Sequence, residues 1–165
     1  MSTGLVSYPA PKADPADAQV VADGWFPPVK LATAREIPRL GDGVVPTERL
    51  IAAIEGGMLH AFRELSAWRS ARAATGASAL EQVTSQSINT RNLAVVLWER
   101  VVIYFAAAEL QGQYRDISAT DDGLDRAAEK VLTADDSRRI ALAAVADLLS
   151  IGSEVAVGRN RVELI

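Results

Sequence analysis

The sequence predicts an all-α protein: a small bundle of three to four helices that carries extended N- and C-terminal arms. Apolar residues recur every three or four positions over long stretches, which is the period of a helix with one buried face. Hydrophobic residues make up 49% of the 165 residues and charged residues 23%, so one folded core is expected. Neither strand–helix alternation nor an internal repeat is present. We therefore expect arms at 1–28 and 152–165, and a bundle at 29–151 with a polar linker at about 76–90.

The N-terminal arm is expected to be extended. Residues 1–24 hold three prolines, small residues and scattered charges, a composition typical of chain that does not fold alone. The motif Gly-Trp-Phe-Pro-Pro at 24–28 then places two large aromatic residues before a rigid pair of prolines. Trp25 and Phe26 either cap the protein's own core or contact a partner subunit, because aromatic residues are typical interface hot spots.

Two helices are expected before residue 76. Leu31 to Glu36 can form a short one. A long helix should start near Pro46-Thr47-Glu48, because proline is tolerated in the first turn and an acidic residue there suits the helix dipole. Gly56 and Gly57 in its middle cost about 2 kcal/mol relative to alanines, which indicates close helix packing or a bend. The apolar stripe of this helix consists of Ile51, Ile54, Met58, Phe62, Leu65 and Trp68.

Two further helical regions are expected after the polar linker. The first runs from about Thr90 to Tyr114, and its wide apolar face makes it the central, most buried helix. The second covers Leu124 to Ile151 and can be two helices, because Thr133 offers a second N-cap. The helical region should end at Gly152, where the C-terminal tail begins.

The last eight residues, 158–165, combine arginines with an apolar ending. The stretch from Val162 to Ile165 alternates in a way that suits one half-buried strand, although no sheet is expected that could accept it. The tail either folds back onto its own helices or docks onto another subunit by strand addition or groove filling. We favour docking, and assign partner binding to the following residues: Trp25, Phe26, Arg159, Arg161, Val162, Glu163, Leu164 and Ile165.

Catalytic, metal and cofactor motifs are absent from the sequence. Without cysteine there are no disulfides or thiolate ligands, and His60, with Glu64 four residues later, lacks the repeated Glu-x-x-His sets of helical metal sites. The acidic pairs at 121–122 and 135–136 suit helix caps. No phosphate-binding loop, nucleophile elbow or Rossmann glycine set is present. We expect neither an enzyme nor a cofactor.

The charge pattern argues against DNA binding, and the short apolar stretches argue against membrane insertion. Net charge is −4, with 17 basic and 21 acidic residues mixed along the chain and no basic stripe. No stretch approaches the roughly 20 apolar residues of a membrane span, and no secretion signal is evident, so a soluble, unsecreted protein is expected.

An alternative interpretation is a small helical regulatory or adaptor protein that binds a cellular protein or nucleic acid. Four arginines could form a local basic face for it: Arg91, Arg100, Arg138 and Arg139. They are interleaved with Glu99, Asp135 and Asp136, which favours a solvated surface of mixed charge.

Several short motifs resemble one known family in order and spacing. They are Gly24-Trp-Phe-Pro27 with Leu31-x-x-x-Arg35; Arg49-Leu50 and Glu64-Leu65-x-x-Trp68-Arg69 on one helix; Tyr114-Arg115-Asp116 followed by Thr120; and Arg161-Val-Glu-Leu-Ile165. The chain resembles the head completion (head-to-tail connector) proteins of contractile-tailed temperate phages from Gly24 to Ile165. It departs from them at Pro28, where the family often has an acidic residue, and at 160–161, where a threonine pair is common.

The resemblance implies a mostly α-helical structural virion protein. Such proteins form a ring, commonly twelvefold, beneath the portal after DNA packaging, and offer a surface to the next neck or tail-terminator protein. By this analogy the C-terminal arm binds the portal or a neighbouring copy, in the head–tail neck of the virion, after assembly in the host cytoplasm. Packaged DNA would pass through the channel without specific binding, which suits a net-acidic chain.

Overall fold

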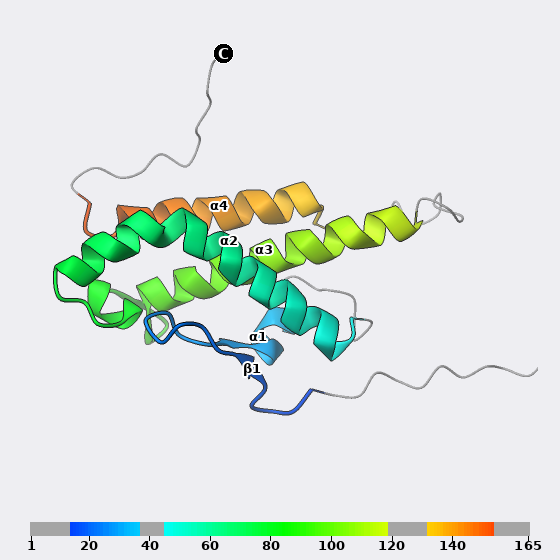
Figure 1. The fold of residues 1–165 in the computed structure, drawn as a ribbon, viewed down its shortest axis with the longest axis horizontal. Coiled ribbons are helices and arrows are strands. Elements are labelled where there is room, and N and C mark those ends of the chain that lie inside the picture. The colour runs from blue at the N-terminus through cyan, green and yellow to red at the C-terminus, as the bar shows by residue number, and fades with distance from the viewer. Residues whose placement is uncertain (1–13, 37–44, 119–131, 154–165) are drawn as a thin grey trace, which may run out of the picture.

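The computed structural model describes residues 14–36, 45–118 and 132–153, and they form a mostly helical molecule (Figure 1). The predicted fold class is therefore confirmed. The helices are α1 (Leu31–Glu36), α2 (Thr47–Ala74), α3 (Leu93–Ser118) and α4 (Ala134–Ser150), with a short 3₁₀ helix η1 (Leu80–Val83). The strands are β1 (Gln19–Val20), β2 (Val29–Lys30), β3 (Ser87–Ile88) and β4 (Arg91–Asn92).

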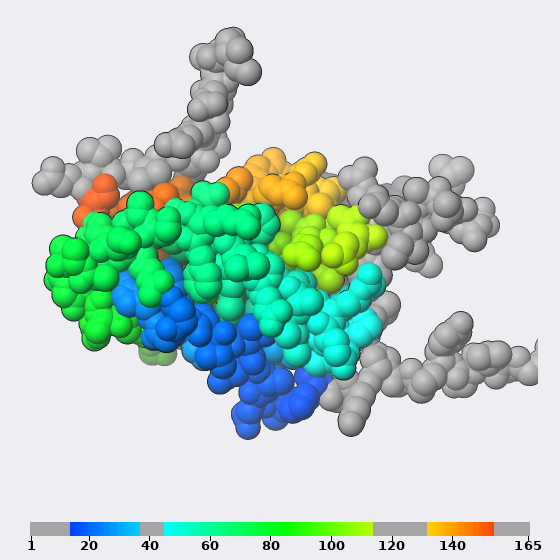
Figure 2. All heavy atoms as spheres, in the orientation of Figure 1, coloured from blue at the N-terminus to red at the C-terminus, as the bar shows by residue number. Residues whose placement is uncertain are grey.

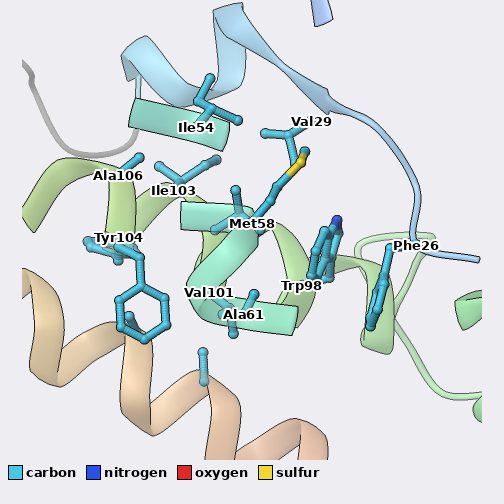
Figure 3. Close-up of a cluster of buried hydrophobic side chains, with 14 of the residues drawn as sticks. Phe26, Val29, Ile54, Met58, Ala61, Trp98, Val101, Ile103, Tyr104 and Ala106 are labelled. Atoms are coloured by element: carbon cyan, nitrogen blue, oxygen red, sulfur yellow. The ribbon is translucent and has the colours of Figure 1, made fainter. Parts of the chain in front are cut away.

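Helix α3 is the centre of the bundle. It packs along both α4 and α2, whereas α2 and α4 touch each other only over a short length. All eight side chains from Val101 to Ala108 are buried. Figure 3 shows how Val101, Ile103 and Ala106 meet side chains from α2 and from the N-terminal segment. The prediction that this is the most buried helix is confirmed, although it begins at Leu93, three residues after the expected start.

Helix α2 has the predicted extent. It begins directly after Pro46, and its last turn is closed by the backbone N–H of Thr75, which donates to the carbonyl oxygens of Ala71 and Arg72. Gly76 follows with a φ of +100°, in the left-handed region that glycine tolerates.

The glycine pair of α2 marks a close approach to α3. A Cβ atom at Gly57 would collide with the backbone carbonyl oxygen of Val102, and one at Gly56 would collide with the Glu109 carboxylate. The expectation of close helix packing at this pair is confirmed, because at Gly57 the backbone of α3 occupies the space that a side chain would need.

The segment predicted as a polar linker is folded onto the bundle. Leu80 of η1 is fully buried, and β3 and β4 form an antiparallel hairpin whose turn residues Asn89 and Thr90 have φ values of 48° and 63°. Asn92 then caps α3, because its Oδ1 accepts hydrogen bonds from the backbone N–H groups of Ala94 and Val95. This hairpin was not expected from an all-α sequence.

Thr133 caps α4 as predicted. Its hydroxyl oxygen accepts a hydrogen bond from the backbone N–H of Asp136, while the Asp136 carboxylate accepts one from the backbone N–H of Thr133. This reciprocal capping box fixes where the helix begins. The hydrogen bonds from Thr133 lower the pKa of the Asp136 carboxyl.

The described part of the expected N-terminal arm lies on the bundle and not away from it. Strand β1 pairs antiparallel with β2, so that Val20 lies opposite Val29, and both side chains are buried. Figure 2 shows this segment (blue) packed against α2. The apolar and aromatic content of residues 20–29 explains the difference, since these side chains have a core to enter. Among the described helices, none combines the length and apolar composition needed to cross a membrane.

Candidate functional site

Trp25 and Phe26 lie within the protein's own core. Trp25 is 7% exposed and Phe26 is 1% exposed. The Phe26 ring stacks on Trp98 of α3 with 4.2 Å between centroids, and the Trp25 ring meets Trp68 of α2 edge-on at 6.0 Å (Figure 3 shows Phe26 beside Trp98). The sequence left two alternatives for these rings, a place in the protein's own core or a contact with a partner subunit. The structure shows both rings in the core. Their contact with a partner stays a prediction.

Hydrogen bonds fix this aromatic motif to three parts of the chain. The indole N–H of Trp25 donates to the carbonyl oxygen of Ala77 at 3.0 Å, and the carbonyl oxygen of Trp25 accepts from the backbone N–H of Leu80 at 2.9 Å. The indole N–H of Trp98 donates to the carbonyl oxygen of Pro27 at 3.0 Å. Both buried indole N–H groups, of Trp25 and Trp98, therefore have an acceptor, as burial requires.

Asp23 and Arg69 hold the turn that presents the two aromatic residues. One carboxylate oxygen of Asp23 accepts the backbone N–H groups of Trp25 and Phe26, both at 3.1 Å, and the other pairs with the Arg69 guanidinium. The guanidinium carbon of Arg69 also lies 5.5 Å from the centre of the Trp25 ring. Gly24, with a φ of +86°, supplies the left-handed residue of the turn.

Helix α2, which carries Arg69, also fixes the base of the C-terminal arm. The indole N–H of Trp68 donates to the carbonyl oxygen of Ile151 at 3.3 Å. One turn later, Nη2 of Arg72 donates to the carbonyl oxygen of Gly152 at 3.1 Å. Gly152 has a φ of +70°, and a Cβ atom there would collide with the Arg72 guanidinium. The point from which residues 154–165 continue is therefore set by two side chains of α2.

A groove of about 610 Å³ opens beside this arm base. We call it the α4 groove, and three parts of the chain form it: the folded linker, the start of α3 and the last turn of α4. Its lining residues are Val83, Thr84, Gln86, Ile88, Leu93, Leu97, Asp147, Ser150, Ile151 and Gly152. Ile88 is 56% exposed, so a large apolar side chain at the border of the groove is left more than half uncovered. The groove therefore presents apolar surface at the place where the arm begins.

A second polar cluster joins the N-terminal segment to α1 and α2. Arg35 binds Asp14 through two guanidinium nitrogens and also donates to the carbonyl oxygen of Val45 at 3.0 Å. Thr47 donates its hydroxyl to the same Asp14 carboxylate. The hydrogen bond from Arg35 lowers the pKa of the Asp14 carboxyl, and the same bond raises the pKa of Arg35. This bidentate pair gives the motif residue Arg35 a structural role.

Three of the four arginines of the alternative basic face are paired with carboxylates. Arg91 pairs with Glu99, Arg138 with Asp135 at 3.1 Å, and Arg139 with Asp136. The guanidinium carbon of Arg100 lies 5.4 Å from the centre of the Tyr104 ring. The described surface here is one of mixed charge, which gives little support to nucleic-acid binding.

The single histidine, His60, is exposed on α2 and stacks on Phe105 of α3 with 5.2 Å between ring centres. Within the described residues, no three His, Cys, Asp or Glu side chains are grouped so that they could hold a metal ion. The acidic pair at 121–122 lies outside the described residues.

Comparison with known proteins places the chain in a family. The model of the phage head completion protein (GPL) family matches residues 20–160. This chain belongs to the phage head completion protein (GPL) family. It is also similar to the head completion/stabilization protein of Escherichia phage P2, with 32% identity over 128 residues, which cover 78% of this chain and 73% of that relative. No solved structure gives a significant match.

The family assignment expected from the four motifs is confirmed, and the structure shows what two of the motifs do. In this head completion protein the residues of 24–27 and 64–69 form one contact region, in which Trp25 meets Trp68 and Arg69. The Tyr-Arg-Asp motif at 114–116 lies in the last part of α3. The descriptions of the family and of the phage P2 relative both name a structural role in completing the phage head.

The predicted arm residues lie outside the part of the chain that the structure describes, and sequence reasoning missed several contacts within that part. Arg159, Arg161, Val162, Glu163, Leu164 and Ile165 are outside the described residues, as is most of the expected arm at 152–165. Sequence reasoning missed Asp23, Arg72 and the α4 groove. An aspartate before Gly-Trp is a signal for a side-chain-capped turn and could have indicated Asp23. No local sequence signal could have indicated the role of Arg72 or the groove. The Arg72 contact and the groove each bring together residues that are far apart in the chain.

Proposed function

We propose that this head completion protein is a connector subunit, copies of which form a ring, twelvefold by analogy, beneath the portal. The ring would join the DNA-filled head to the neck and tail. Its membership of the head completion family supports a structural role in finishing the phage head. The structural observation that carries the proposal further is the fixed base of the C-terminal arm, at Trp68 and Arg72.

A fixed base suits an arm that makes contacts between subunits. Eight residues lie between Ser153 and Val162, and the nine Cα-to-Cα steps that join the two can span at most about 30 Å, which is comparable to the width of a small domain. An arm of this reach adds contact area between copies without a larger core. Contacts between unlike surfaces of identical copies close into a ring when the rotation between copies allows it.

The partners follow from this arrangement. The apolar arm end would bind the portal protein or the neighbouring copy, and the far side of the ring would receive the next neck or tail-terminator protein. Packaged DNA would pass through the channel without specific binding, in keeping with a net charge of −4. The protein would act in the neck of the virion, after assembly in the host cytoplasm.

Deletion of residues 162–165 tests the docking role of the arm. The shortened protein should still fold, with the same helical circular dichroism as the full chain, because residues from Val20 to Leu148 form the buried core. It should fail to join portal-bearing heads in a sedimentation assay. A matched control is Leu59→Ser, which removes an exposed apolar side chain (57% exposed) from the middle of α2. Normal attachment of the shortened protein to heads would refute the docking role.

The alternative function, a helical regulator or adaptor, predicts a different result. Such a protein would bind duplex DNA or a cellular protein in the absence of phage components, and DNA binding would weaken steeply with salt. The pairing of Arg91, Arg138 and Arg139 with carboxylates supports the connector instead.

A further inference from the structure

We propose that the α4 groove holds the apolar end of this chain's own C-terminal arm, residues 162–165, before the protein is assembled into a particle. The groove and the arm would then form an intramolecular contact that covers the apolar end until another partner takes its place. This contact does not depend on the ring or the portal proposed above, because both of its halves belong to one chain.

The chemistry of the groove suits an extended apolar segment. Leu93 and Leu97 of α3 contribute apolar surface at one side, and Ile151 contributes it at the other. Ile88 of the β3–β4 hairpin leaves more than half of its side chain uncovered at the same place, at 56% exposure. A single exposed apolar residue needs no explanation, but one that borders an apolar groove marks surface that a second segment can cover.

The position of the groove makes the chain's own arm the favoured occupant. Ile151 and Gly152 line the groove, so the arm starts at its edge. The eight residues between Ser153 and Val162 are enough to leave the groove and return to it. A segment tethered by so short a linker has an effective concentration in the millimolar range. At micromolar protein, a second copy competes poorly with it.

The arm sequence matches the groove in pattern and charge. In an extended segment Val162 and Leu164 point to the same side, so both can enter apolar surface together. Arg159 and Arg161 precede them and are opposite in charge to Asp147 of α4, which lines the groove, while Glu163 points to the other side of an extended segment.

Engineered cysteines test this contact directly, because the natural chain contains none. The test variant is the full chain with Ile88→Cys and Leu164→Cys. The matched control carries Leu59→Cys and Leu164→Cys, since Leu59 is 57% exposed, close to the exposure of Ile88, and lies outside the groove. Both exposed positions tolerate substitution without loss of core packing. The proteins are incubated at low micromolar concentration in a glutathione buffer, free thiols are trapped, and intact masses are measured.

We expect the intramolecular disulfide to form at least about tenfold faster in the Ile88 variant than in the Leu59 control, independently of protein concentration. Equal rates in the two variants would overturn the proposal. Covalent dimers that replace the intramolecular product and increase with concentration would also overturn it, because the occupant would then be a second copy. Failure of the docking function leaves this result unaffected, since docking is measured on heads and the disulfide on the isolated chain.

Discussion

The indole nitrogen of Trp68 donates a hydrogen bond to the carbonyl oxygen of Ile151, 83 residues further along the chain, at 3.3 Å. The same tryptophan meets Trp25 edge-on with 6.0 Å between ring centres. One side chain of α2 therefore contacts both the N-terminal aromatic motif and the base of the C-terminal arm. Two arginines of the same helix contact the same two segments. Arg69 pairs with Asp23 beside the aromatic motif, and Arg72 donates to the carbonyl oxygen of Gly152 at the arm base.

Replacing Trp68 with phenylalanine should loosen the arm base. The Ile151 carbonyl oxygen loses its donor while an aromatic ring remains, so the free energy of unfolding should fall by about 1–3 kcal/mol. Amide hydrogen exchange should accelerate more at 151–153 than in α3, as measured by mass spectrometry. Ser66→Ala, an exposed change on the same helix, serves as the control. Unchanged exchange at 151–153 would show that Trp68 does not hold the arm base.

Two glycine-to-alanine changes should affect the free energy of unfolding in opposite directions. Gly57→Ala places a methyl group against the Val102 carbonyl, so α2 and α3 must separate and the free energy of unfolding should fall by about 1–3 kcal/mol. In Gly112→Ala of α3 the added methyl group meets no atom within 4 Å. This change should raise the free energy of unfolding by up to about 1 kcal/mol, because alanine has the higher helix propensity. Urea unfolding of both variants checks the pair. A neutral Gly57→Ala would mean that the helices do not approach as closely as described.

Stability should depend on pH through Asp14. Its carboxyl pKa is lowered, mainly by the hydrogen bond from Arg35, so the unfolded chain binds the proton more tightly than the folded protein. The stabilisation is fully present above the unfolded value of about 3.9 and is lost as pH falls through the lowered folded pKa. Asp14→Asn should lower the free energy of unfolding by about 1–2 kcal/mol at neutral pH.

Urea unfolding at several pH values checks the Asp14 prediction. The difference between Asp14→Asn and the natural chain should shrink as pH falls below about 4, because the natural carboxylate then becomes protonated as well. Asp17→Asn removes an exposed carboxylate from the same segment and should change little. A difference that stays constant with pH would rule out the ion pair as the source of the effect.

Phe26→Ala separates a core role from a partner role. The ring is 1% exposed and stacked on Trp98, so its loss should lower the free energy of unfolding by about 3–5 kcal/mol. Attachment to heads, expressed per folded molecule, should be unchanged. Val21→Ala, at a side chain that is 70% exposed, should change stability by no more than about 0.5 kcal/mol. A stable Phe26→Ala variant that fails to attach would instead assign Phe26 to a partner contact.

Local signals predicted the helices well. Pro46 marked the start of α2, Thr133 marked the start of α4, and the apolar period identified α3 as the central helix. These signals depend on residues close together in the chain, where capping and periodicity act. The four motifs likewise identified the family, although they did not show that two of them are in contact.

The folded linker shows where local signals are insufficient. Residues 76–90 are small and polar, yet Leu80 is fully buried, and its backbone N–H donates a hydrogen bond to the carbonyl oxygen of Trp25, 55 positions earlier in the chain. The two aromatic residues posed the same difficulty, since an exposed hot spot and a buried core residue have the same side chains. Burial depends on what surrounds a residue in space, and the sequence pattern of 24–28 does not contain that information.

By itself the sequence determined the helical class, the starts of α2 and α4, and the family, because caps, periodicity and motifs are properties of neighbouring residues. Only the tertiary structure decided that Trp25 and Phe26 enter the core, that Trp68 and Arg72 hold the arm base, and that a groove opens beside it. These contacts join residues more than 50 positions apart, and hydrogen bonds and apolar burial over such separations arise only when the helices pack.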